Sequence, residues 1–317
     1  MTRAQRAWWS SLSLLVLLLG SFSVLAASQV LPVLLIYGYQ PVPGFRTTQL
    51  WEEFAEYLSG NNIVNAQTIQ VSDDHNFYYL PAADAQHRDV FMSNYALSFE
   101  PTVRDIFFYT RRFVDEIDAM DSRFGVGHSV GGLIARTYVE ISDFESVLGT
   151  DDFGDYGIAY GGEIRTLVLL ATPNHGTLVA SLGEWFSTMS RQLAPGSEFL
   201  KLLNEEHWLD GRLAAFNPSV RYVSMAGQTC LGCGLRLNKD ICLRECVEEA
   251  LAWNGSDLVV MMASAYLPEA ENCALIGFDH VKNHTDVIIA AAIKAMLAGK
   301  QSPVAIYASG FLEFQPE

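Results

Sequence analysis

Hydrophobic positions along the chain gather in short runs, separated by longer segments of mixed polarity. Val30–Tyr37 is almost continuously apolar, as is typical of a parallel strand buried on both faces. The same pattern predicts further strands at Ile63–Val71, Asp89–Tyr95, Phe124–Val126, Ile164–Ala171 and Val220–Ala226. Helical spacing of apolar residues marks Thr48–Leu58, Pro101–Met120, Leu133–Ile141 and Asp286–Ala298. Strands that alternate with helices predict an α/β fold, a mostly parallel sheet flanked by helices.

A glycine-rich turn, Gly127-His128-Ser129-Val130-Gly131-Gly132, joins one predicted strand to the helix after it. A serine on such a strand-to-helix turn is typical of a nucleophile elbow, which lifts the hydroxyl above a sheet. Side chains in place of Gly127 and Gly131 are expected to collide with the neighbouring strand and helix. The strand, turn and helix supply the context that the motif requires, so Ser129 is the candidate nucleophile.

The serine hydroxyl needs a base that removes its proton and an acid that orients the base. In folds with a nucleophile elbow, the serine, the acid and the histidine follow one another in that order along the chain. Asp257 lies on a polar turn before apolar residues and is the candidate acid, with Asp240 and Asp279 as alternatives. An Asx turn is the purely structural alternative for Asp257.

Two histidines, His280 and His284, follow Asp257. His284 lies directly before the predicted helix Asp286–Ala298, and a loop in that place can swing an imidazole over the edge of the sheet. We therefore predict His284 as the base and expect His280 to lie on a surface loop.

Acyl transfer also requires preset hydrogen-bond donors for the developing oxyanion. The backbone N–H of Val130, directly after the serine, is one expected donor. The other is the backbone N–H of Tyr39, in the loop after the first strand.

The chain resembles bacterial and archaeal lipases and esterases of the α/β-hydrolase fold. The resemblance rests on Leu34–Gly38, Gly127–Gly132, Leu170–Thr177, Ser256–Asp257 and Asn283–Thr285, which occur in the expected order. It implies hydrolysis of carboxylic esters, often acylglycerols, and a helical lid that would correspond to Leu178–Phe216. Ordinary crossover helices are the alternative for that segment. The family often has His-Gly at the oxyanion loop, where this chain has Tyr37-Gly38.

Two segments, one acidic and one cysteine-rich, contain residue types that bind metal ions. Some such lipases have calcium sites similar to Asp151, Asp152 and Asp155, but we expect a solvated acidic loop here and predict no metal and no cofactor. Gly227–Asn254 is a cysteine-rich insertion that contains Cys230, Cys233, Cys242 and Cys246. Zinc is one hypothesis for these residues, but disulfides Cys230–Cys246 and Cys233–Cys242 suit an exported protein better. The spacing alone leaves all three pairings open. Cys273 is expected to be a buried, inert thiol.

The N-terminal segment Trp8–Leu25 is uncharged and mostly apolar, with Arg3 and Arg6 before it and Ala26-Ala27-Ser28 after it. These flanks predict a signal peptide over residues 1–26 and an exported domain over residues 27–317, with an uncleaved membrane anchor as the alternative. The formal net charge of −16 repels phosphate backbones, so nucleic acid is not an expected partner. The sequence leaves the oligomeric state open.

Together these features predict an exported serine hydrolase that cleaves carboxylic esters of acyl chains through an acyl-enzyme. Its expected partner is an acyl ester or lipid substrate, with transient contact between the lid and a lipid interface. An acyltransferase or thioesterase with the same three residues is the alternative enzyme. A binding protein that keeps the fold without catalysis is the alternative from another class.

Overall fold

The computed structural model describes residues 32–38, 47–95, 104–120, 124–141, 160–183, 187–205, 207–209, 212–214, 216–229, 255–268, 270–276, 278–280, 285–297 and 305–307. All of them belong to one compact unit, Pro32–Glu317. Several sequence predictions lie outside the described residues: the signal peptide or anchor, the disulfide candidates Cys230, Cys233, Cys242 and Cys246, and Tyr39, Asp151, Asp152, Asp155, Asp240 and His284.

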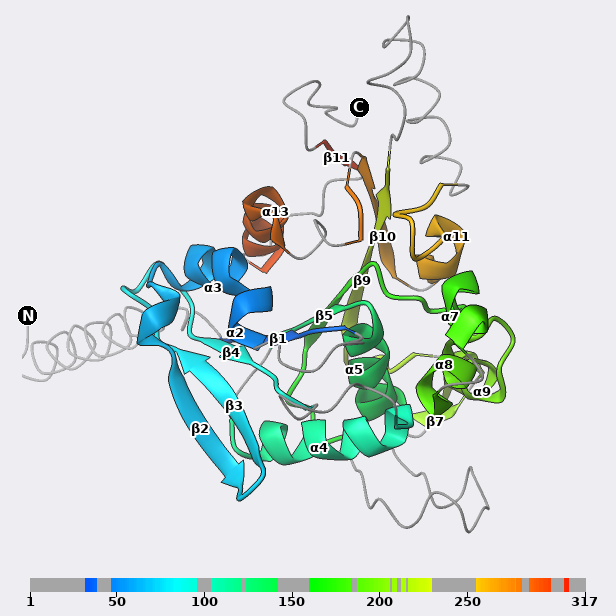
Figure 1. Ribbon diagram of the computed structural model, residues 1–317, viewed down its shortest axis with the longest axis horizontal. Coiled ribbons are helices and arrows are strands. Elements are labelled where there is room, and N and C mark those ends of the chain that lie inside the picture. The colour runs from blue at the N-terminus through cyan, green and yellow to red at the C-terminus, as the bar shows by residue number, and fades with distance from the viewer. Residues whose placement is uncertain are drawn as a thin grey trace, which may run out of the picture. The chain divides into compact units, whose positions relative to one another are not determined.

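A nine-stranded sheet runs through the described part of the unit (Figure 1). Its strand order is β11-β10-β9-β6-β5-β1-β4-β3-β2. Neighbours from β11 to β4 are parallel, whereas β3 and β2 extend one edge as an antiparallel hairpin. The strands are β1 Val33–Ile36, β2 Gln67–Ser72, β3 His75–Leu80, β4 Val90–Met92, β5 Phe124–His128, β6 Thr166–Leu170, β9 Arg221–Gln228, β10 Glu271–Ile276 and β11 Ala305–Tyr307. The predicted α/β class with a mostly parallel sheet is confirmed.

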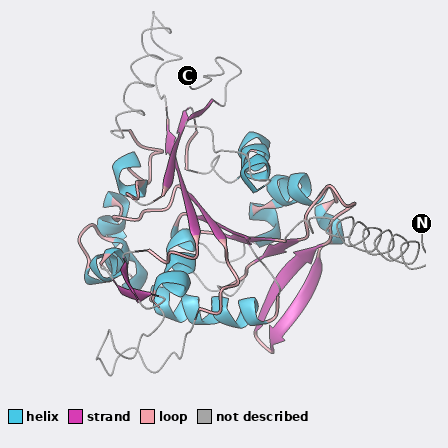
Figure 2. Ribbon diagram, turned by 180° about the vertical axis from the view of Figure 1, so that it is seen from behind, coloured by secondary structure: helices cyan, strands magenta, loops and turns pink. Residues whose placement is uncertain are grey.

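Helices cover both faces of this sheet (Figures 1 and 2). On one face α3 (Glu52–Ser59) packs against α13 (Val287–Leu297), and on the other α4 (Ile106–Asp118) packs against α5 (Val130–Glu140). Short helical turns complete the set: α2 Thr47–Leu50, η1 Ile63–Asn65 and α11 Met262–Ala265. None of the helices in the described ranges is both long enough and apolar enough to cross a membrane.

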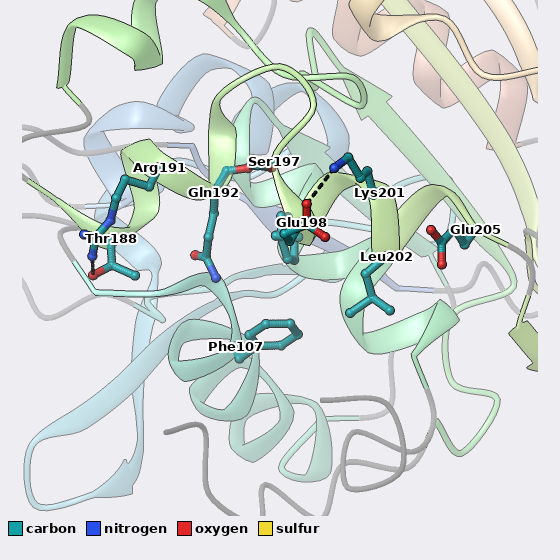
Figure 3. A pocket seen from close by; sticks show the side chains of 10 residues that line it. Phe107, Thr188, Arg191, Gln192, Ser197, Glu198, Lys201, Leu202 and Glu205 are labelled. Carbon is teal, nitrogen blue, oxygen red and sulfur yellow. Dashed lines mark hydrogen bonds and ion pairs between the residues drawn. The ribbon is translucent and has the colours of Figure 1, made fainter. Parts of the chain in front are cut away.

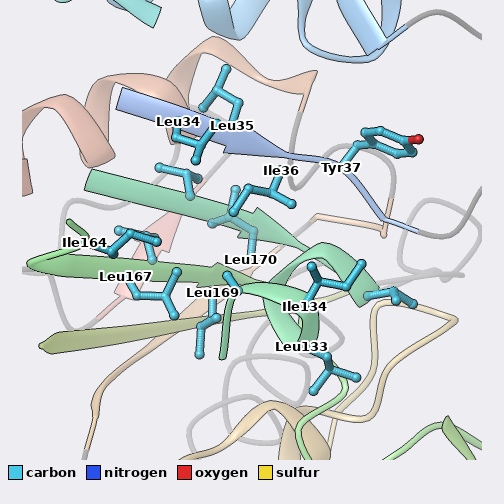
Figure 4. Packing of buried hydrophobic residues seen from close by; sticks show 14 of the residues in the cluster. Leu34, Leu35, Ile36, Tyr37, Leu133, Ile134, Ile164, Leu167, Leu169 and Leu170 are labelled. Atoms are coloured by element: carbon cyan, nitrogen blue, oxygen red, sulfur yellow. The ribbon is translucent and has the colours of Figure 1, made fainter. Parts of the chain in front are cut away.

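The core lies where α5 packs on β1, β5 and β6 (Figure 4). All four residues of β1 and all five of β6 are buried, as expected of central strands that helices cover on both faces. Leu133 and Ile134 of α5 and Leu169 and Leu170 of β6 all belong to this buried cluster (Figure 4). The packing of α5 on these strands fixes the position of its N-terminus, where Ser129 lies.

The sequence pattern did not predict β3, β10 or β11. In β3 buried residues alternate with half-buried ones, and β10 begins with the exposed Glu271 and the half-buried Asn272, so neither is a continuous apolar run. Cys273 on β10 is buried, as predicted.

The segment Leu178–Phe216 lies between β6 and β9, which are neighbours in the sheet. It contains helices α7 (Leu178–Gly183), α8 (Thr188–Leu193) and α9 (Glu198–Asn204) and a small hairpin of β7 (His207–Leu209) and β8 (Arg212–Ala214). Helices were expected in this segment, and the hairpin was not. On α8 and α9 the apolar residues Met189, Leu193, Phe199 and Leu203 are buried, and Leu202 is half-buried.

Candidate active site

The nucleophile elbow forms as its sequence predicts. Ser129 ends the strand–turn connection between β5 and α5 with φ 54° and ψ −127°, a left-handed conformation that is rare for a residue with a side chain. A Cβ on Gly127 would lie 2.5 Å from the Cα of Gly132, and one on Gly131 would overlap the carbonyl oxygens of Ile36 and Tyr37. Both predicted collisions are therefore present, one with the helix and one with strand β1.

Ser129 contacts an imidazole, and that imidazole contacts a carboxylate. The Nε2 of His280 lies 2.9 Å from the Oγ of Ser129, and its Nδ1 lies 2.8 Å from the Oδ2 of Asp257. An ionised carboxylate only accepts hydrogen bonds, so the Nδ1 of His280 carries the proton. The Nε2 is then left as the acceptor for the hydroxyl of Ser129.

The imidazole in this position belongs to His280, whereas the sequence analysis favoured His284 and expected His280 on a surface loop. That preference is corrected. Strand β10 is not a continuous apolar run, so the sequence did not show that His280 follows a strand of the sheet, and His284 was preferred. Because β10 ends at Ile276 and Phe278 is buried, His280 reaches the same sheet edge as Ser129. The apolar residues from Cys273 to Phe278 were the signal that could have revealed this strand.

The main chain of His280 is held from two sides. Its N–H donates to the carbonyl of Asp257 at 3.0 Å, and its carbonyl accepts from the Nε2 of His128 at 2.9 Å. The rings of His128 and His280 are 4.7 Å apart between centroids. His128 was predicted only as part of the elbow, but it also fixes the loop that carries His280.

Asp257 is fully buried. Its carboxylate both contacts the histidine and forms an Asx turn, the two roles that the sequence left as alternatives. Its Oδ1 accepts from the N–H groups of Val259 and Val260 at 3.0 and 2.7 Å, which is an Asx-type turn, and its Oδ2 faces His280. Leu258 in the same turn has φ 84°, a second left-handed residue with a side chain. The turn therefore orients the carboxylate and restricts it to one direction. The alternative acid Asp279 is half-buried and directly precedes His280 in the sequence, whereas the carboxylate that faces the ring of His280 is that of Asp257.

Ser129 lies between the start of α5 and the loop after β1. Val130 is the first residue of α5, where an N–H group has no acceptor within its own helix. The loop after β1 approaches from the other side, because a Cβ on Gly38 would lie 2.6 Å from the Cβ of Ser129. The N–H of Val130 stays a predicted donor, and the other predicted donor, Tyr39, lies outside the described residues.

A mostly apolar cavity of about 180 Å³ opens beside Ser129. It is lined by Ser129, Val130, Pro173, Thr177, Val179, Ala180, Ser190, Leu193, Val259 and Val260. A larger cavity of about 430 Å³ lies between α4, α8 and α9 and carries Arg191, Glu198, Lys201 and Glu205 on its walls (Figure 3). Ser129 does not line that larger cavity, so the smaller one is the candidate site for a substrate.

The described residues include no cluster of three or more His, Cys, Asp or Glu side chains that could bind a metal ion.

Comparisons with known proteins give similar structures but no similar sequence. No family model matches the chain, and a search of curated proteins finds no match. Among solved structures, the chain is similar to the mature lipase BlEst2 of Bacillus licheniformis, with a TM-score of 0.49 and 14% identity over 85% of this chain and 93% of that one. It is also similar to EstA from Clostridium botulinum, with a TM-score of 0.47 and 12% identity over 84% of this chain and 86% of that one. For the Staphylococcus hyicus lipase the TM-score is 0.43 and the identity 12%, over 86% of this chain and 93% of that one. Over most of its length, the chain is similar to solved bacterial lipases at low sequence identity.

Proposed function

We propose that this protein is an exported serine hydrolase that cleaves carboxylic esters of acyl chains. The observation that carries the proposal is the unbroken line of hydrogen bonds from Ser129 through His280 to Asp257. A buried carboxylate, an imidazole in a fixed tautomer and a serine on a nucleophile elbow are the parts that acyl transfer needs. Export is supported by the sequence of residues 1–28.

In the first step, the Oγ of Ser129 attacks the carbonyl carbon of the ester while the Nε2 of His280 takes the hydroxyl proton. Asp257 stabilises the imidazolium that forms, and its fixed Oδ2 keeps the ring aligned. The carbonyl oxygen becomes an oxyanion, which accepts from the N–H groups of Val130 and Tyr39.

The tetrahedral intermediate then collapses. The bond to the leaving alcohol breaks, and the alcohol takes the proton from the Nε2 of His280. Water attacks the acyl-serine next, gives its proton to His280 and releases the carboxylic acid. Ser129 recovers its proton in the last step, so the protein ends the cycle unchanged.

The cavity beside Ser129 supports a preference for short acyl chains. An engineered cavity of roughly 150 Å³ holds one benzene molecule, which has six carbon atoms. By that comparison, the 180 Å³ beside Ser129 would hold an acyl chain of about six to eight carbons. Longer chains would extend past Val179 and Leu178, whose side chains are 49% and 69% exposed on α7.

These exposed residues also indicate that the lid is shorter than the predicted segment Leu178–Phe216. Helices α8 and α9 are tied to the body, because the N–H of Ile106 donates to Gln192 at 2.7 Å and Arg136 donates to Asn204 at 3.2 Å. Helix α7 instead presents Leu178 and Val179 to the outside. We therefore propose α7, rather than the whole of Leu178–Phe216, as the part that contacts a lipid interface.

The proposal is tested with p-nitrophenyl butyrate and a fluorophosphonate probe. Ser129→Ala should lower kcat by roughly four to six orders of magnitude and abolish labelling. Ser190→Ala is the matched control, because Ser190 lines the same cavity without contacting His280 in the described structure, and it should keep at least a third of the activity. His280→Ala should match the loss in Ser129→Ala, and His284→Ala should not. Near-normal hydrolysis by Ser129→Ala would refute the proposal. In a separate experiment on the wild type, product analysis with an added alcohol acceptor distinguishes a hydrolase from an acyltransferase.

A further inference from the structure

Three neighbouring strands bring their carboxyl ends together at the candidate site. In the sheet, β1 lies between β4 and β5, and both pairs are parallel. Parallel neighbours end at the same edge, so the residues that follow them meet there (Figure 1). Tyr37-Gly38 follows β1, Ser129 follows β5, and Tyr95 lies shortly after the end of β4.

Tyr95 is fully buried, and its hydroxyl binds the main chain of the loop after β1. The hydroxyl lies 3.0 Å from the carbonyl oxygen of Tyr37 and 3.1 Å from that of Gly38, so it donates its one proton to this pair. Its ring stacks on the ring of Tyr37 with centroids 4.7 Å apart and an interplanar angle of 12°. Tyr109 also packs edge-on against the ring of Tyr95, with centroids 5.4 Å apart.

The hydroxyl is available as a donor over the whole working pH range. Burial raises the pKa of Tyr95 well above its usual value, with nearby Tyr37, Tyr109 and Glu116 adding to the shift. The proton therefore stays on the oxygen.

We propose that Tyr95 is a positioning residue for the oxyanion hole. By holding the carbonyls of Tyr37 and Gly38, the hydroxyl of Tyr95 fixes the main chain directly before the second oxyanion donor of the proposed function. This inference rests on that proposed function, and Tyr95 itself does not touch the substrate.

The close approach between Gly38 and Ser129 makes the loop's position critical. A Cβ on Gly38 would lie 3.2 Å from the Oγ of Ser129, so the loop backbone has little clearance from the nucleophile. Donor groups must lie within a narrow distance of the developing charge, and a displacement of about 1 Å can cost roughly a hundredfold in rate. Losing the hydroxyl of Tyr95 would free two carbonyls and allow such a displacement.

The test compares Tyr95→Phe with wild type. The phenylalanine keeps the stacked ring and removes only the hydroxyl. For p-nitrophenyl butyrate, kcat should fall about 10- to 100-fold while KM changes less than threefold, because the donor acts mainly on the transition state. A trifluoromethyl ketone forms an oxyanion adduct with the serine, so its affinity should fall by the same factor as kcat/KM.

Tyr138→Phe is the matched control. Tyr138 is a buried tyrosine of α5 whose hydroxyl donates to Glu163 at 2.7 Å, far from the loop in sequence. Its loss should leave kcat, KM and ketone affinity unchanged within twofold. Thermal melting is measured for every variant. If Tyr95→Phe shows no cooperative transition, Tyr95→Met fills a similar space without a donor and is measured in its place.

Unchanged kcat in the folded variant would overturn the inference, and so would a fall in kcat with unchanged ketone affinity. Both results differ from a failure of the proposed function. In that failure the wild type itself would not react with a fluorophosphonate, or Ser129→Ala would remain active.

Discussion

The buried ion pair between Arg136 and Glu140 allows a stability prediction that can be worked out from the structure. Both side chains are fully buried on α5, one turn apart. The guanidinium of Arg136 donates twice to the carboxylate of Glu140, from Nε at 2.9 Å and from Nη2 at 2.8 Å. It also donates to Asn174 in the loop after β6 and to Asn204 on α9. Arg136 therefore joins α5, the helix that follows Ser129, to the segment between β6 and β9.

We predict that Arg136→Met lowers the free energy of unfolding by about 3–5 kcal/mol, the usual cost of leaving one buried charge without its partner. Methionine replaces the apolar stem of arginine, so most of this loss comes from Glu140 rather than from a cavity. The double variant Arg136→Met/Glu140→Leu removes both charges and should recover most of the lost stability.

The loss should also depend on pH. Burial raises the pKa of Glu140, and Arg136 opposes that shift. Without Arg136, the folded-state pKa of Glu140 rises further above the unfolded value of about 4.3. When a carboxyl has a raised pKa in the folded state, the protein loses stability as the pH rises from the unfolded-state pKa through the folded-state pKa. The loss in free energy of unfolding caused by Arg136→Met should therefore be larger at pH 8 than at pH 5.

Urea unfolding followed by tryptophan fluorescence measures these free energies, with the slope checked for constancy among the variants. Lys201→Met is the control. The Nζ of Lys201 lies 2.6 Å from Glu198, but the two side chains are 54% and 89% exposed, so the loss should stay below about 1 kcal/mol. The reasoning is refuted if Arg136→Met costs no more than this control, or if the double variant is as unstable as the single one.

Three further predictions concern the site itself. Asp257→Asn should lower kcat for p-nitrophenyl butyrate roughly 10⁴-fold, because the amide favours the wrong tautomer of His280, and should leave the melting temperature unchanged. A normal kcat would exclude Asp257 as the orienting acid. Gly131→Ala should destabilise the protein by about 1–3 kcal/mol and remove activity, because the added Cβ would overlap the carbonyl oxygen of Tyr37. A soluble variant with normal urea unfolding would contradict this geometry. Ala180→Leu reduces the volume of the cavity beside Ser129. In a series of p-nitrophenyl esters, the preferred acyl chain should therefore be about two carbons shorter than for the wild type. An unchanged preference would show that the acyl chain binds elsewhere.

The sequence by itself determined the parts of this protein that depend on local spacing. The apolar runs of β1 and β6 and the glycines around Ser129 predicted two central strands and the elbow, because burial on both faces and close backbone approach restrict residue type locally. Asp257 was also found locally, since a polar turn before apolar residues limits where a carboxylate can lie.

Only the tertiary structure decided which residues meet across the chain. His280 and His284 both satisfy the order serine, acid, histidine, and the choice depends on where β10 ends and on the contacts of His128 and Asp257 with the main chain of His280. Tyr95 is 57 positions from Gly38 in sequence and reaches it because β4 pairs with β1. Strand order results from the packing of the whole sheet, and no local pattern in the sequence encodes it.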